Sequence, residues 1–208
     1  MSISTAGSCG SARPAPAHRR CSPPSAAALR TTPNIADIAP RTVAFLRGIN
    51  LGKRRVTNAR LKELFEAAGC TDVSTFQAAG NVLFDDGPGV AEIRAVLEHG
   101  LGYDAAVYLR TADEIASVAG PPPFPQVHVE KPAALIVTFF DRPVPTAVEA
   151  HSNDVDVLRV DGRELYWLAG NGIAKTTLNW RPIEKLFPDP GTNRNINTVR
   201  AIATKLTG

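Results

Sequence analysis

Apolar residues in this chain alternate between strand-like and helix-like spacing, and this alternation limits the fold more than any other feature. The apolar run over 42–46 stops at Arg47 and Gly48, and a run of this length predicts a buried strand. Apolar residues then recur every three or four positions over 61–68 and stop at Gly69, which predicts a helix. The ordered part of the chain is therefore expected to open with a strand and then a helix.

The same reading extends to residue 109. Short apolar runs over 73–76 and 82–84 predict two strands, the helical spacing over 90–101 predicts a second helix, and 105–109 predicts a further strand. The resulting order is β-α-β-β-α-β, which is the order of a ferredoxin-like split βαβ unit with two helices on one face of a sheet.

The second half of the chain mixes helices and strands in another order. Residues 112–118 predict a short helix, and the prolines over 121–125 predict a loop. The run over 134–140 is so continuously apolar that we expect a central strand covered on both faces. A short helix is expected near 146–152.

A hairpin and a helix are expected at the end of the chain. Asp161 and Gly162 separate two strand-like runs, 157–160 and 164–168, and are expected to be the two central residues of the hairpin turn, both at positive φ. An apolar stripe over 199–206 predicts a terminal helix, with residues 192–195 suited to capping its start. We therefore expect an α+β fold, a single domain over 40–208 whose halves, 40–110 and 111–208, share a core.

Residues 1–39 differ from the rest in composition. They are rich in Ala, Ser, Pro and Thr, lack aromatic residues and are expected to be disordered. Residues 1–40 also contain four arginines and one aspartate, which accounts for the whole formal charge of +3 and leaves 41–208 neutral. A transit peptide fits this composition, whereas a secretory signal does not, because no continuous apolar segment is present. A dispensable tail, or a start codon placed too far upstream, is the favoured interpretation.

Several functional classes lose support from motifs that the sequence lacks. The three cysteines and four histidines are scattered, so neither a disulfide framework nor a metal site is expected, and the chain is assigned to a reducing compartment, the cytoplasm. No nucleophile elbow, P-loop or dinucleotide fingerprint is present, so no cofactor is identified. No apolar run approaches the length of a membrane-spanning helix.

Three polar segments are candidates for a binding site. Residues 47–55 contain two glycines and four basic residues, a combination suited to an anion, and Arg47 and Asn50 are favoured because they adjoin the strand end. Lys53, Arg54 and Arg55 are as readily explained as a solvated basic loop.

The other two segments lie further along the chain. Gly80 and Asn81 are explained equally by a tight turn with a residue at positive φ. Residues 192–198 combine a helix start with Arg194, which could hold a carboxylate or phosphate, although a buried hydrogen-bond network explains the same residues.

These three segments resemble the bacterial domain-of-unknown-function 1697 family. The stretches over 45–52, 75–84 and 192–199 occur in the family's order, and the resemblance spans about 41–206. It implies an α+β fold with ferredoxin-like character and a bacterial cytoplasmic protein, without an assigned reaction. The sequence departs from the family at Lys53, where a glycine is usual, at 78–79, where the family has Gln-Ser, and at Ile196, where the family often has Trp.

The leading functional hypothesis is a small-anion or nucleotide-binding module with a polar cleft formed by the three segments. An enzyme of unknown reaction in the same cleft is an alternative, but the motifs hold no His, Cys, Asp or Glu to act as base or nucleophile. RNA binding on the ferredoxin-like sheet, with Phe76 and Phe84 as stacking residues, is disfavoured by the neutral charge of 41–208. The candidate ligand-binding residues are Arg47, Gly48, Asn50, Gly80, Asn81, Arg194, Asn195, Asn197 and Thr198.

Overall fold

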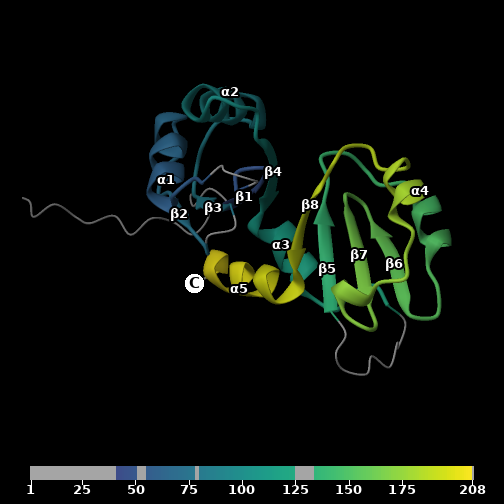
Figure 1. Cartoon of the computed structure of the whole chain (residues 1–208). Coiled ribbons are helices and arrows are strands. Elements are labelled where there is room, and N and C mark those ends of the chain that lie inside the picture. Colours follow the sequence, from purple (N-terminus) through teal and green to yellow (C-terminus); the bar gives the residue numbers. More distant parts are fainter. Residues whose placement is uncertain (1–40, 51–54, 78–79, 125–133, 208) are drawn as a thin grey trace, which may run out of the picture. The chain divides into compact units, whose positions relative to one another are not determined.

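A computed structural model of the chain describes residues 41–50, 55–77, 80–124 and 134–207 (Figure 1). The segment predicted to be disordered, 1–39, lies outside the described residues. Contacts divide the chain into 1–35 and 36–208, and everything described below belongs to the second unit.

The first half forms a four-stranded antiparallel sheet in the order β2-β3-β1-β4. The predicted order β-α-β-β-α-β is observed, whereas the ferredoxin-like assignment stays a prediction. The elements are β1 (Thr42–Arg47), α1 (Asn58–Ala67), β2 (Ser74–Thr75), β3 (Asn81–Phe84), α2 (Val90–Leu101) and β4 (Ala106–Thr111).

The second half forms another antiparallel sheet, in the order β6-β7-β5-β8. The strand β5 is central, as its continuous apolar sequence predicts. With helices and two antiparallel sheets, the α+β class is confirmed. The elements are α3 (Ala112–Ala119), β5 (Ala134–Phe139), a 3-10 helix (Thr146–His151), β6 (Asp156–Asp161), β7 (Glu164–Ala169), a second 3-10 helix (Ile173–Lys175), α4 (Trp180–Glu184), β8 (Thr192–Asn195) and α5 (Ile196–Thr207).

The segment expected to cap the last helix is mostly a strand. Residues 192–195 form β8, in which Asn193 pairs with Thr138 of β5. Along β8 the side chains alternate between buried and exposed, because successive residues of a strand point to opposite faces. Only Asn195 caps α5, with its Oδ1 accepting from the backbone N–H of Asn197 at 2.9 Å.

The hairpin between β6 and β7 is confirmed, but its turn lies one residue later than predicted. Asp161 pairs with Glu164, so Gly162 and Arg163 form the two-residue loop. Of these two residues, only Gly162 has a positive φ, at 59°. A positive φ at the first loop residue alone is typical of a type II′ turn, in which glycine is favoured at that position.

Apolar side chains from both sheets meet in one cluster. Strand β1 is buried on both faces: Ala44 and Leu46 pack with α1 and α2, whereas Val43 and Phe45 face the opposite way. On that second face the ring of Phe45 stacks on Phe139 of β5, with ring centroids 4.2 Å apart. Residues of α3 and α5 complete this cluster. Among the described helices, none is long and apolar enough to cross a membrane.

The other face of the second sheet has a core of its own. Ile136, Leu165 and Trp167 point away from the shared cluster and pack against the segment that contains α4. Figure 1 shows α4 beside this sheet. The chain between β7 and β8 therefore covers the outer face of the second sheet, and the pocket described below lies there.

Candidate functional site

Arg194 of β8 lies in a buried network that joins the two sheets. Its side chain is 8% exposed, and its Nε donates to Oδ1 of Asn81 on β3 at 2.6 Å. Nη2 donates to the carbonyl oxygens of Leu46 and Gly80, both at 3.2 Å. Nη1 donates to Oγ1 of Thr192 and to the carbonyl oxygen of Asn193. These five bonds equal the number of N–H groups in a guanidinium, so the donors of Arg194 are used within the protein.

The groups that accept hydrogen bonds from Arg194 are all uncharged: an amide oxygen, a hydroxyl and backbone carbonyl oxygens. Burial lowers the pKa of the Arg194 guanidinium to about 10. The guanidinium carbon also lies 5.2 Å from the centre of the Phe45 ring, within the range of a cation–π contact. Asn81 in turn donates from Nδ2 to the carbonyl oxygen of Phe76. The hydrogen bonds of Arg194 thus connect β8 with β1 and β3.

The remaining predicted site residues lie around this network. Gly48 and Gly80 both adopt positive φ, at 84° and 68°, as expected for turn residues. Asn50 accepts at Oδ1 from the backbone N–H of Val56. Asn197 and Thr198 lie in the first turn of α5, after Asn195. Lys53 and Arg54 lie outside the described residues.

Arg47 points to a different place from Arg194. It is the last residue of β1 and is exposed, and its Nη1 donates to the carbonyl oxygens of Gly191 and Pro190 at 2.7 and 3.2 Å. Arg47 thus reaches the turn that precedes β8, at one end of a hollow in the outer face of the second sheet. The sequence predicted Arg47 as a site residue but not this hollow.

The hollow has a volume of about 620 Å³, which is within the range of small-molecule pockets. Its floor comes from β5, β7 and β8, its walls come mainly from the segment between β7 and β8, and Arg47 at the end of β1 closes one end. The lining residues are Arg47, Thr138, Trp167, Ile173, Thr176, Trp180, Glu184, Phe187, Asp189, Pro190 and Asn193.

Aromatic rings form one wall of this pocket. Trp167 and Trp180 pack edge to face, with ring centroids 4.9 Å apart. The carboxylate of Asp156, which is fully buried, accepts from the Trp167 indole N–H at 3.1 Å and from Thr176 and Thr177. Asp156 therefore fixes both the Trp167 ring and the chain that follows β7.

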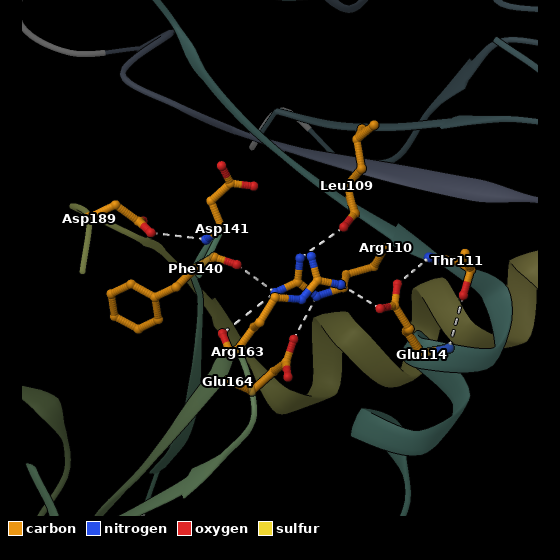
Figure 2. A network of polar contacts seen from close by, with 9 residues as sticks. All are labelled: Leu109, Arg110, Thr111, Glu114, Phe140, Asp141, Arg163, Glu164 and Asp189. Carbon is orange, nitrogen blue, oxygen red and sulfur yellow. Dashed lines mark hydrogen bonds and ion pairs between the residues drawn. The ribbon is translucent and has the colours of Figure 1, made fainter. Parts of the chain in front are cut away.

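Asp189 and Gly191 shape the end of the pocket nearest Arg47. The two carboxylate oxygens of Asp189 accept from the backbone N–H groups of Gly191 and Asp141, the second contact being drawn in Figure 2. Gly191 has φ of 61°, and a Cβ there would lie 2.7 Å from the Phe140 ring. Only glycine therefore allows this turn to offer its carbonyl oxygens to Arg47.

Tyr108 lies behind the same turn. Burial and the Asp189 carboxylate raise the pKa of the Tyr108 hydroxyl to about 12, and the Arg47 charge opposes them. Arg47 and Asp189 both contact Gly191, so both charges are held at the turn that lies against this buried hydroxyl.

The two phenylalanines considered for RNA stacking are not exposed platforms. Phe84 is buried in the cluster beneath α1 and α2. Phe76 packs against the shared cluster, and Lys205 lies over its ring at 5.7 Å. The described structure gives no support to base stacking by this pair.

Sequence reasoning missed most of the pocket. Trp167 and Trp180 are the only tryptophans in the chain, and both line it. Glu184 and Asp189 bring carboxylates that the three polar motifs lack. The available signals were the rarity of tryptophan and the turn-forming sequence over 188–191.

Comparisons with known proteins agree with the fold and the motifs. The solved structure of conserved bacterial protein SP0830 from Streptococcus pneumoniae is similar, with a TM-score of 0.63 and 19% sequence identity, covering 81% of this chain and 99% of that chain. At this identity the likeness concerns the fold alone. Among curated proteins, none matches. A sequence profile described as protein of unknown function (DUF1697) matches residues 40–166. The chain therefore belongs to the DUF1697 family.

Proposed function

We propose that this protein binds a small organic ligand that combines a flat aromatic part with an anionic group. The observation that carries the proposal is the pocket of about 620 Å³ in which both tryptophans, Phe187 and Arg47 meet. A ligand explains why aromatic and charged side chains share it.

The aromatic wall supports the flat part of the ligand. Aromatic and apolar side chains supply most of the favourable free energy in small-molecule pockets, because they remove apolar ligand surface from water. Trp180 and Phe187 are half-buried, and Ile173 is 49% exposed at the rim. A planar ring that covers these side chains would bury apolar surface of both partners.

Arg47 supports the anionic part. Its Nη1 is held by the carbonyl oxygens of Pro190 and Gly191, so the guanidinium is already oriented before a ligand arrives. Its Nε and Nη2 make no hydrogen bond to the residues that the structure describes. A carboxylate or phosphate oxygen pair could accept from these groups in the two-bond geometry that arginine favours.

The remaining residues of the predicted site then serve the pocket indirectly. Arg194 holds β8 against β1 and β3 through its bonds to Leu46, Gly80 and Asn81, and β8 carries Asn193 on the pocket floor. In this proposal Arg47 is the member of the predicted set that contacts the ligand. Because the three cysteines are scattered and suggest no disulfide framework, we propose a cytoplasmic location.

The proposal is tested with a panel of aromatic anions that includes benzoate, naphthoate, indole acetate, phenyl phosphate, naphthyl phosphate and adenosine monophosphate. Thermal-shift measurements find candidates, and equilibrium dialysis measures their dissociation constants. A ligand at a hundred times its dissociation constant stabilises the folded state by about 2.7 kcal/mol.

At least one panel member should raise the melting temperature of the wild-type protein. The shift should disappear in Arg47→Met and persist in Arg94→Met, a control in which an exposed arginine paired with Asp104 is lost. If no panel member binds at millimolar concentration, or if binding survives Arg47→Met, the proposal is wrong.

A further inference from the structure

The charges around the pocket restrict the anion that it can take. Among the lining residues that the structure describes, Arg47 is the one cation, whereas Glu184 and Asp189 are carboxylates. The Asp189 oxygens accept from two backbone N–H groups, which keeps the carboxylate in place at the turn that Arg47 also contacts. The described lining residues therefore bring two carboxylates and one cation to the pocket.

We infer that the pocket selects singly charged aromatic anions, of which aromatic carboxylates are the simplest, and excludes doubly charged phosphate monoesters such as nucleoside monophosphates. This inference rests on the proposed function and narrows its ligand class. A single negative charge can pair with the Arg47 guanidinium. A second negative charge would find no further cation among the described lining residues and would be repelled by Glu184 and Asp189.

The apolar wall strengthens this discrimination. Trp167, Trp180 and Phe187 form an apolar part of the pocket wall, and charge–charge interactions are screened less where a bound ligand displaces water from such a wall. The penalty for the second charge is thus larger here than on an open surface. A carboxylate and a phosphodiester carry the same charge, so both should be accepted if charge is the determinant.

The experiment compares three compounds that share one ring system at pH 8. They are naphthoate, methyl naphthyl phosphate, which is a phosphodiester, and naphthyl phosphate, which is a phosphate monoester. The first two are monoanions and the third is a dianion, since the second pKa of a phosphate monoester is about 6. Equilibrium dialysis should show the two monoanions binding at least about tenfold more tightly than the dianion. Equal or tighter binding of naphthyl phosphate that still requires Arg47 would overturn the inference and leave the proposed function intact.

Two variants test whether repulsion by Glu184 causes the weaker binding of the dianion. Glu184→Gln should tighten the binding of naphthyl phosphate by about fivefold and change the binding of naphthoate less, because the removed charge repels the dianion twice as strongly. Glu63→Gln, on the exposed face of α1, is the matched control and should change neither constant. If the ratio of the dissociation constants of naphthyl phosphate and naphthoate is unchanged in Glu184→Gln, the charge argument is contradicted. The absence of any Arg47-dependent binding would overturn both the inference and the proposed function.

Discussion

Arg110 of β4 and Glu164 of β7 form a buried ion pair that joins the two sheets, with 2.6 Å between Nε and Oε1 (Figure 2). Arg110 is 1% exposed and also donates from Nη2 to the carbonyl oxygen of Phe140 and from Nη1 to that of Leu109. Burial raises the pKa of the Glu164 carboxyl above its usual value, although the Arg110 charge pulls it down. Each charge therefore depends on the other to remain buried.

Removing one member of this pair should be costly. Arg110→Met leaves Glu164 without its partner and should lower the free energy of unfolding by about 3–5 kcal/mol, measured by urea denaturation. The double variant Arg110→Met/Glu164→Leu should be more stable than the sum of the two single effects predicts, by at least about 1 kcal/mol. Additive single effects would show that the pair is not energetically coupled.

The two arginines near β8 should respond differently to substitution. Arg194→Met removes the donor that reaches the buried Oδ1 of Asn81 and one donor to each of the carbonyl oxygens of Leu46 and Gly80, so the free energy of unfolding should fall by about 3 kcal/mol or more. Arg47→Met removes an exposed side chain and should cost about 1 kcal/mol or less. Similar costs in chemical denaturation would contradict the assignment of Arg194 to the scaffold and Arg47 to the pocket.

Gly162 in the β6–β7 turn should tolerate only residues that accept positive φ. A β-branched side chain is strained at φ of 59°, so Gly162→Val should lower the free energy of unfolding by about 1–3 kcal/mol. Gly162→Asn should cost less, because asparagine enters the left-handed region more easily. The prediction fails if thermal melts rank the two variants in the opposite order.

Alkaline pH should destabilise the fold through Tyr108. Its pKa is raised from 10 to about 12 in the folded protein, so between these values the folded state retains a proton that the unfolded state has lost. The stability supplied by Tyr108 is therefore complete below pH 10 and is lost as the pH rises to about 12. Unfolding experiments across this range should show a shallower loss of stability in Tyr108→Phe than in wild type. Parallel pH profiles for the two proteins would exclude this role.

Local spacing predicted the elements whose structure depends on neighbours in sequence. The strand β5 and the helix α2 follow from apolar runs and helical periodicity, and the β6–β7 hairpin follows from a glycine turn between two such runs. The misplaced turn centre arose because the Asp-Gly pair suggested a type I′ turn, whereas pairing of Asp161 with Glu164 shifts the loop by one residue.

The binding pocket depends instead on contacts between distant residues. Arg47 meets Gly191 across 144 positions, and Arg194 meets Asn81 across 113. No local pattern reveals that Arg194 is enclosed and Arg47 exposed, since both belong to short polar motifs. Side chains alternate between the two faces along β8, so only some of them lie on the pocket floor. Which ones do so follows from the pairing of β8 with β5, and the sequence does not reveal this pairing.

The most direct test of the proposed binding site follows the two tryptophan indole N–H resonances in a nuclear magnetic resonance titration with naphthoate. Both tryptophans of the chain line the pocket, so these two signals come from its wall. The indole signals should move progressively to saturation in the wild-type protein and stay fixed in Arg47→Met. Indole signals that stay fixed while other resonances shift, or that shift equally in Arg47→Met, would contradict the proposed binding site.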